Sequence, residues 1–453
     1  MTHSKDSVRS PLSFRGYWPI VVLVIFMASV GMAQEAWEHA HDAGVKASKE
    51  SRFADAEKLL MQSLEIARHS AEISPLVGRS LVDLAEVYRT EGKYGEAQPL
   101  YEQALKVNSK QFGTDSVEVA EVLDRHAELY KTLNDYAHAE PMLQQALDIR
   151  KKKLPPDSAA IAQVESDLGE LYTSTGNFEQ AQALLKAALD TREKALGPEH
   201  QDVAETLEAL GNYYRKIEKT GDAEQCYRRA VSIFGKTVGG DHPDYANAME
   251  SLALLYSARR QFDLAVPLLE RVLAIREKIF GQDHHDVAVS LDGLGLVQLQ
   301  QLHYGQAAGS YERALKIWER ILGPESTELS ADLSNLAAAY EGNRHFAVAE
   351  PLLLRALAND TKGLPPDSAD LGSDLHNLAT LYVLMDRKQL ALSFFQQALD
   401  FRTRVLGPNS ADTIETLRGY SVELHFLNRQ PEAKVIDDKL KAAETATKVA
   451  PAN

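Results

Sequence analysis

The chain has 453 residues, with 65 acidic against 49 basic side chains and a formal net charge of −16. It is too long to fold around one compact hydrophobic core, and its acidity argues against a nucleic-acid-binding protein, which needs a concentrated basic surface. The single cysteine, Cys226, rules out an internal disulfide.

The first 33 residues have the pattern of a secretory signal peptide. An apolar run over residues 18–30 is followed by small residues up to Ala33, and three cations precede it, namely Lys5, Arg9 and Arg15. We therefore expect cleavage after Ala33 and an exported protein, periplasmic or secreted. The alternative is an uncleaved anchor over residues 18–33 in the inner membrane, and only then would the protein contact a membrane.

Residues 34–77 are predicted to form a degenerate first helix pair. Apolar and small residues keep a helical spacing there, at Phe53, Ala56, Leu59, Leu60 and Leu64. Their spacing slips by one residue from the pattern that follows, so this pair is not a full copy of the later units.

A repeat of 42 residues occupies residues 78–414 and predicts eight tandem units. Columns of small, leucine and tyrosine residues recur at offsets of three, four and seven, which place them on one face of a helix. One alanine recurs at every period without a slip, at Ala97, Ala139, Ala181, Ala223, Ala265, Ala307, Ala349, Ala391 and Ala433. Each unit should therefore hold two helices, with small residues where their backbones approach.

The order Leu84-Ala85-Tyr88-Gly92-Tyr94-Ala97-Tyr101-Ala104 resembles the tetratricopeptide repeat, or TPR. The 42-residue unit, with phrases such as Leu196-Gly197-Pro198-Glu199-His200, looks like the variant found in kinesin light chain. The resemblance implies an all-α fold, a right-handed superhelical solenoid of antiparallel helix pairs. It also implies a concave groove lined by the first helix of each unit. The cargo-binding role of kinesin light chain does not carry over, because the early groove is acidic here.

Helix stops and caps are predicted between the units. Glycine or proline ends each second helix, and a serine or histidine three residues later suits the N-cap of the next helix. The cations in the last helical turns could mark a phosphate-binding stripe, and His284-His285-Asp286 could mark a metal site. Capping and the helix dipole explain both features, so we predict no metal and no cofactor.

Residues 415–443 are expected to form a partial repeat that caps the stack, because the outer face of the last helix is charged. The tail over residues 444–453 is small and polar, and we expect it to be disordered. Cys226 stands where other units carry leucine or methionine, and is expected to be a small buried hydrophobe.

The predicted groove changes in character along the chain. The position after the small column reads Glu86, Glu128, Glu170, Asn212, Leu254, Leu296, Ala338 and Thr380, with Val289 and Leu299 adding apolar surface to its later half. We expect a peptide to dock near Leu254, Val289, Leu296 and Leu299, which would be exposed in a monomer. Local packing or contacts within a dimer are the alternative. The glutamates are candidate partner contacts, or a solvated face paired with Arg89 and Lys131.

The unit over residues 289–330 is the most irregular. Gln298 replaces the column tyrosine, Leu302 replaces the turn glycine, and Gly293 and Gly295 flank Leu294 within a predicted helix. A glycine inside a helix costs on the order of 1 kcal/mol, so a packing or functional reason is expected.

These observations predict a non-enzymatic protein–protein interaction scaffold of the cell envelope, with an unknown protein or peptide as its partner. The alternative is a structural module that assembles with copies of itself as a homo-oligomer. An enzyme is a remote third class, because the sequence carries no nucleophile elbow, zinc-protease motif or phosphate loop.

Overall fold

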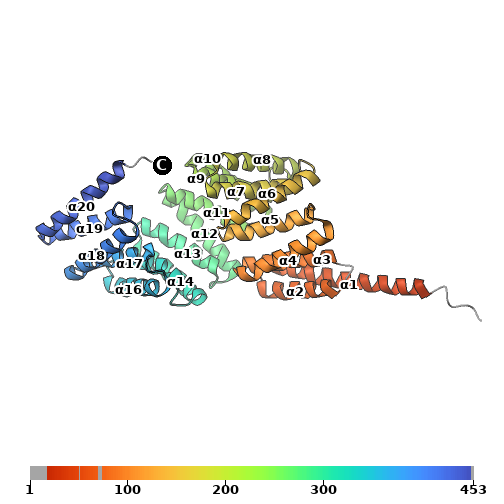
Figure 1. The fold of residues 1–453 in the computed structure, drawn as a ribbon, viewed down its shortest axis with the longest axis horizontal. Helices are drawn as coiled ribbons and strands as arrows, with labels where there is room; N and C mark the ends of the chain where they lie inside the picture. Colours follow the sequence, from red (N-terminus) through yellow and green to blue (C-terminus); the bar gives the residue numbers. More distant parts are fainter. Residues whose placement is uncertain (1–17, 50–51, 70–73, 450–453) are drawn as a thin grey trace, which may run out of the picture. The chain divides into compact units, whose positions relative to one another are not determined.

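A computed structural model describes residues 18–49, 52–69 and 74–449, with side chains for residues 32–48, 52–69 and 75–447. The described chain is 85% helical, without strands, and consecutive helices pack in pairs (Figure 1). It divides into two compact units, Met1–Ile233 and Phe234–Asn453, and the boundary falls inside one helix.

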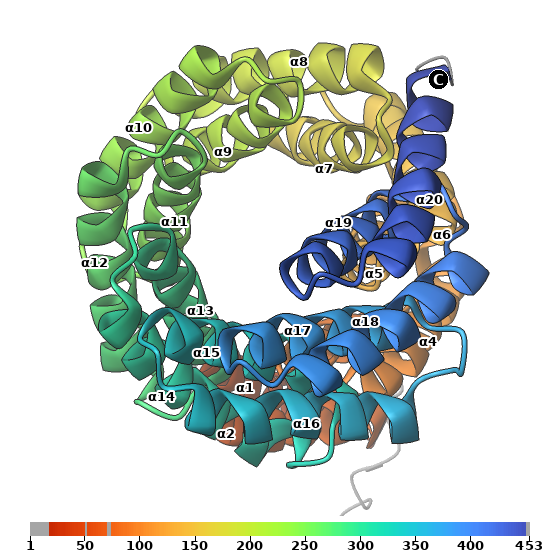
Figure 2. The ribbon, with the colours of Figure 1, turned by 90° about the vertical axis from the view of Figure 1, so that its left-hand side faces the viewer.

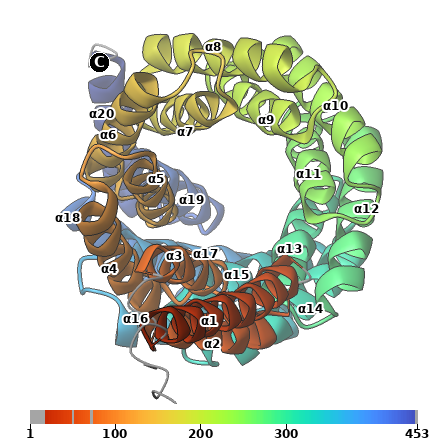
Figure 3. The same cartoon turned by 90° about the vertical axis from the view of Figure 1, so that its right-hand side faces the viewer.

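The helices of the first unit are α1 (Trp18–Lys49), α2 (Phe53–His69), α3 (Ser74–Thr90), α4 (Tyr94–Phe112), α5 (Val117–Thr132), α6 (Tyr136–Lys153), α7 (Ala159–Thr175), α8 (Phe178–Leu196), α9 (Gln201–Lys216) and α10 (Thr220–Thr237). Within this unit α3, α5, α7 and α9 lie on the inner side of the curved row of pairs, and α4, α6, α8 and α10 on the outer side (Figure 3). Contacts between α3 and α5 and between α7 and α9 join the inner helices of successive pairs.

The helices of the second unit are α11 (Pro243–Ala258), α12 (Phe262–Phe280), α13 (His285–Gln300), α14 (Tyr304–Leu322), the 3₁₀ turn η3 (Thr327–Leu329), α15 (Ser330–Gly342), α16 (Phe346–Gly363), α17 (Ala369–Leu384), α18 (Lys388–Val405), α19 (Ala411–Phe426) and α20 (Gln430–Val449). Here α11, α13, α15 and α17 form the inner side, and α12, α14 and α16 the outer side (Figure 2). The eight expected units correspond to the pairs from α3/α4 to α17/α18.

The alanine lattice lies at the contacts between helices. Its nine members, from Ala97 to Ala433, are fully buried. The glycines of the preceding small column occupy still closer contacts: a Cβ added to Gly169 would lie 2.5 Å from Leu185, and one added to Gly211 would lie 2.4 Å from Tyr227. The repeated small residues therefore set how closely the two helices of a pair approach.

Most of the predicted caps are present in the connectors; Ser368 is an exception, since its hydroxyl bonds the Asp370 carboxylate and accepts no backbone N–H. Ser116 and Ser410 accept hydrogen bonds from backbone N–H groups of α5 and α19, and the Nδ1 atoms of His200, His242 and His284 do the same at 3.2–3.3 Å. An accepting Nδ1 places the proton of a neutral imidazole on Nε2. Helices α4, α8, α12 and α14 end at glycines with positive φ, as predicted.

The turn between the two helices of each pair also contains a residue with left-handed backbone. The sequence predicts this conformation less clearly, because few of these residues are glycines. Residues at the 42-residue spacing have φ between +56° and +86°, namely Gly92, Asn134, Gly176, Glu218, Arg260, Leu302, Arg344, Asp386 and Asn428. Two of these nine are glycines. The side chains at the other positions accept a conformation that costs them energy.

The C-terminal helix is longer than predicted. Helix α20 runs to Val449, so the prediction of disorder is wrong for residues 444–449, while 450–453 lie outside the described residues. Two contacts hold this part of the helix: Ala443 is buried, and the Glu444 carboxylate forms an ion pair with Arg418 at 2.7 Å.

At the other end, residues 1–17 and the side chains of residues 18–31 lie outside the description, so the signal peptide and the alternative anchor stay predictions. Among the described side chains, no helix has the length and apolar character to cross a membrane.

Candidate functional site

The inner-face column, defined as Glu86, Glu128, Glu170, Asn212, Leu254, Leu296, Ala338 and Thr380, lies on the inner helices α3 to α17. Its glutamates are half-buried, whereas Leu254 and Leu296 are exposed. The inner face thus changes along the chain from acidic to apolar. The glutamates lie in the first unit, and the exposed leucines lie in the second.

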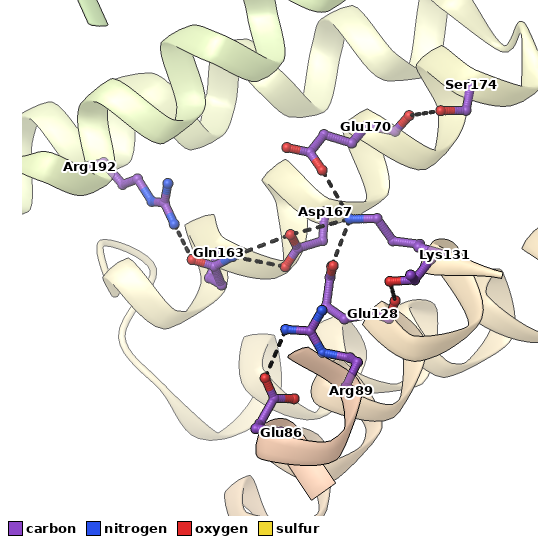
Figure 4. Close-up of polar contacts among 10 residues, drawn as sticks. Glu86, Arg89, Glu128, Lys131, Gln163, Asp167, Glu170, Ser174 and Arg192 are labelled. Atoms are coloured by element: carbon purple, nitrogen blue, oxygen red, sulfur yellow. Dashed lines mark hydrogen bonds and ion pairs between the residues drawn. The ribbon is translucent and has the colours of Figure 1, made fainter. Parts of the chain in front are cut away.

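In the first unit Glu128 and Glu170 belong to a network of ion pairs centred on Lys131, and Glu86 pairs beside it with Arg89 (Figure 4). The Lys131 Nζ lies 2.7 Å from Glu128, 3.0 Å from Glu170 and 3.6 Å from Asp167. Arg89 pairs with Glu86 at 2.9 Å. The solvated-face alternative correctly gave the two local pairs, Glu86 with Arg89 and Glu128 with Lys131. It did not foresee that Lys131 also bridges from α5 to α7.

The network contains more carboxylates than cations and is partly shielded from solvent. Burial and the nearby Asp167 carboxylate raise the pKa of Glu128 and of Asp124. Lys131 is itself buried, but the carboxylates of Glu170, Asp167 and Glu128 outweigh the effect of burial and raise its pKa well above the ordinary value. The lysine therefore stays charged and holds the carboxylates of two neighbouring helices together.

A pocket of about 820 Å³ opens beside this network along α5, α7 and α9. Eight carboxylates and four arginines line it, namely Glu121, Asp124, Glu128, Asp167, Glu170, Asp202, Glu205 and Glu208 with Arg89, Arg125, Arg150 and Arg192. Its surface is polar and in excess acidic, which suits a cationic group better than an anion.

A second column of buried cations was missed by the sequence interpretation. Arg150, Arg192, Arg276 and Arg402 stand on outer helices at multiples of the 42-residue spacing, and all four are buried. Arg192 donates to the carbonyl of Asp202 at 2.6 Å and to the Thr206 hydroxyl at 2.7 Å. Arg150 and Arg402 reach the carbonyls of Ala160 and Asp412 in the same way. These three arginines thus tie one pair to the first turn of the next inner helix, and Arg276 reaches the next inner helix through Ser290.

The apolar part of the inner face lies in the second unit. Leu254 on α11 and Val289 and Leu296 on α13 are 47%, 39% and 44% exposed, and together they form what we call the apolar patch. Leu299 does not belong to it: its side chain is half-buried and packs against the core that contains Tyr311 and Leu315. The expectation that Leu299 is exposed is therefore wrong, because its helical position turns toward α14.

The family-model comparison agrees with the repeats. The model of the tetratricopeptide repeat matches residues 43–109, 76–152, 160–236, 223–278, 244–317 and 370–436, which is well over half of the chain. The chain belongs to the tetratricopeptide repeat family. Repeats of this family generally form scaffolds that bind protein or peptide partners, as opposed to catalytic domains.

Two solved structures with TM-scores above 0.5 share this fold, and a third is similar in sequence. The apo form of RapI is 13% identical over 82% of this chain and 98% of its own, with a TM-score of 0.56. A STAND protein with a TPR sensor from Pyrococcus horikoshii is 12% identical over 79% and 54%, with a TM-score of 0.56. A putative kinesin light chain from Podosopora anserina with nearly identical TPR-like repeats is 26% identical over 46% and 97%, with a TM-score of 0.36. No curated protein matches the sequence.

The irregular TPR unit has local structural reasons for two of its departures. The buried Gln298 accepts a 2.8 Å hydrogen bond from Ser310, which satisfies the amide that replaces the column tyrosine. A Cβ on Gly295 would lie 3.0 Å from the buried Tyr311 ring. Gly293 has open space where its side chain would be, so packing does not explain it.

Other residues that could carry chemistry make contacts within the TPR units. The ligand atoms of His284, His285 and Asp286 lie within 4.8 Å of one another. The Nδ1 of His284 caps α13, as predicted, and that of His285 pairs with the Asp286 side chain at 2.9 Å. Cys226 is half-buried, and burial raises the pKa of its thiol to about 11, so the thiol stays protonated at neutral pH.

The column of cations near the helix ends also pairs within the chain. Lys278, Arg320 and Lys362 contact Asp241, Asp283 and Glu325, each at a spacing of 37 residues. These pairs tie successive connectors together and neutralise the cations, which disfavours a phosphate-binding stripe.

Proposed function

We propose that this TPR protein is a scaffold that holds a peptide segment of another protein against the apolar patch of its second unit. The observation that carries the proposal is the exposure of Leu254, Val289 and Leu296 on inner helices. Leu254 and Leu296 occupy equivalent positions in successive units, and Val289 lies two helical turns before Leu296 on the same face. Exposed leucines at such positions are typical of binding surfaces.

The energetics favour this site over the acidic network. Burying an exposed leucine under a partner yields roughly 1–2 kcal/mol, so three apolar side chains supply useful affinity without new ion pairs. Glu86, Glu128 and Glu170 are already held by Arg89 and Lys131, and a partner would have to replace those contacts. The glutamates remain candidates, but weaker ones than the leucines.

A matched pair of substitutions tests the proposal. Leu254 and Leu264 are both 47% exposed, but Leu264 lies on the outer helix α12. Leu254→Glu and Leu296→Glu should abolish capture of the partner by the tagged chain, while Leu264→Glu should leave capture intact. All three should keep wild-type helicity by circular dichroism. Equal capture by all four proteins would exclude this surface.

Self-association is the competing outcome of the same test. If a second copy of the chain is the occupant, light scattering on the purified chain alone should give a dimer or larger species, and Leu296→Glu should return it to a monomer. A monomer at all concentrations, with retained capture of another protein, favours the scaffold.

We further propose that the scaffold works in the cell envelope. The support is the sequence of the first 33 residues, with cations before an apolar run and small residues at its end. Mass spectrometry of the protein isolated from its host should find Gln34 at the amino terminus. An intact amino terminus in a soluble cytoplasmic fraction would contradict export, and an intact one in the membrane fraction would indicate the anchor.

A further inference from the structure

The buried arginine column has a position where the arginine is replaced by an acid. The column reads Asn108, Arg150, Arg192, Phe234, Arg276, Trp318, Asp360 and Arg402. In the second unit, Arg276 uses its guanidinium to bind Glu250 at 2.9 and 2.7 Å, Asn247 at 2.9 Å and Ser290 at 2.8 Å. Asp360 occupies the equivalent position on α16 and brings a carboxylate instead.

A pocket of about 460 Å³ lies at this replacement, between η3, α15, α16 and α17. Its lining contains the acceptors that arginine uses elsewhere in the column: Asp374 stands 14 residues after Asp360, as Ser290 does after Arg276, and Ser334 stands 26 residues before it, as Glu250 does. The lining holds the acids Glu328, Asp360, Asp370 and Asp374 and no lysine, arginine or histidine.

Asp374 is the group that this arrangement leaves unsatisfied. Its side chain is 4% exposed, and its Oδ2 is buried without a hydrogen-bond partner. Burial and the neighbouring Asp360 raise the pKa of Asp374. Asp360 is 2% exposed and accepts a hydrogen bond from the Ser330 hydroxyl at 2.5 Å. The nearest column arginine, Arg402, binds Ser373 at 3.2 Å but directs its other bonds to Asp412, Glu415 and Thr416.

We propose that this pocket receives the guanidinium group of an arginine side chain from the partner protein, in the place that a column arginine fills in other units. Charge complementarity favours this occupant, since two buried carboxylates and several hydroxyls line the pocket and no cation is among its lining residues. Arg402 contacts this lining through Ser373 and binds Asp412, Glu415 and Thr416 with its remaining bonds. The inference rests on the proposed scaffold function and gives the partner's segment a chemical character: apolar side chains for the apolar patch, and an arginine for the pocket on α15–α17.

The test needs no knowledge of the partner. The full chain is titrated with N-acetyl-arginine amide and, in parallel, with N-acetyl-citrulline amide, which has nearly the same shape and no charge. Saturation-transfer NMR should detect binding of the arginine compound alone. Asp374→Asn should weaken it by about tenfold, the effect of losing a hydrogen bond to a charged group. Asp360→Arg should abolish it, because the new side chain fills the pocket from within.

Several results would overturn the assignment. These are equal signals from the arginine and citrulline compounds, the absence of any signal, and undiminished binding by Asp374→Asn. Displacement of the arginine compound by calcium ions at far lower concentration would mark a metal site instead. Asp283→Asn, at an exposed connector, is the control for a general loss of negative charge.

The outcomes separate the two proposals. The titration uses no partner, so its failure would remove the arginine inference and leave capture through Leu254 and Leu296 untouched. If those leucines prove irrelevant to capture, the proposed function fails even where the arginine compound binds.

Discussion

Trp318 donates a 2.8 Å hydrogen bond from its indole Nε1 to Oδ2 of Asp292. Trp318 occupies the position that Arg276 occupies one repeat earlier. Unlike an arginine, the neutral indole donates a hydrogen bond to the carboxylate but supplies no positive charge to balance it. Oδ1 of Asp292 is buried without a partner, and burial raises the pKa of this carboxyl to about 7. Burial likewise raises the pKa of Asp332 to about 6. The inner face of α13 and α15 therefore carries acids that destabilise the fold when they ionise.

Asp292→Asn should stabilise the protein at pH 8 and have little effect at pH 4. The folded-state pKa lies above the unfolded value of 3.8, so the contribution of Asp292 to stability is fully present below that value and is lost as the pH rises through about 7. The amide oxygen can still accept the indole hydrogen bond. We expect a gain on the order of 1 kcal/mol at pH 8, measured by thermal unfolding.

The control for this prediction is Asp283→Asn. Asp283 is exposed, and its hydrogen bond with Arg320 lowers its pKa, so the same substitution there should not stabilise at high pH. An Asp292→Asn effect that is the same at pH 4 and pH 8 would contradict the electrostatic origin.

Gly293→Ala should stabilise the second unit. Nothing lies within 4 Å of the added Cβ, so alanine gains helix propensity without a clash, by about 0.5–1 kcal/mol. Gly211→Ala is the matched comparison, because its Cβ would meet the buried ring of Tyr227 at 2.4 Å and should destabilise. Calorimetry on both variants checks the opposite signs. A stabilised Gly293→Ala variant with weakened partner capture would place Gly293 in the docking surface.

Leu302→Gly should also raise the unfolding temperature. Leu302 has φ +63° and is 66% exposed, so its side chain has a strained backbone and little burial to lose. Relief of the left-handed strain is worth about 1–2 kcal/mol, less the entropy cost of glycine. The reverse exchange, Gly176→Leu at the equivalent turn with φ +86°, should destabilise by a similar amount. If the two exchanges shift stability in the same direction, backbone strain is not the cause.

Much of this fold was predictable because its signals are periodic and local. Small residues at helical spacing, glycine stops, and serine or histidine caps each follow from backbone geometry, and the structure has most of them where the sequence places them. The buried arginines were missed because a helical arginine usually indicates a solvent-exposed face. Arg192 is buried because the acceptors at Asp202 and Thr206 come from the next inner helix, which one helical pattern alone cannot reveal.

The candidate site was predictable in composition but not in detail. The change from glutamate to leucine along the inner face could be read from one column. Two details depend on packing between helices and could not be predicted from one column. The Leu299 side chain packs into the core against α14, and Oδ2 of Asp374 lies buried without a hydrogen-bond partner. A search of the 42-residue columns for an arginine that is replaced by an acid in one unit would have found Asp360, although not its pocket.

Lys131→Met should show how far the acidic network depends on one cation. The substitution keeps the aliphatic stem but leaves Glu128, Asp167 and Glu170 without their shared partner, in surroundings where burial already raises the pKa of Glu128. We expect a loss of about 2 kcal/mol at pH 7, less than for a fully buried pair because Glu170 is partly exposed. The loss should shrink as the pH falls, because the carboxylates take up protons and no longer repel one another.

Chemical unfolding at pH 7 and pH 4.5 measures both values, and Lys131→Arg, which keeps the charge, is the control. An equal loss at both pH values would mean that Lys131 stabilises by packing alone, whereas unchanged stability at pH 7 would mean that the acids of α5 and α7 need no internal cation.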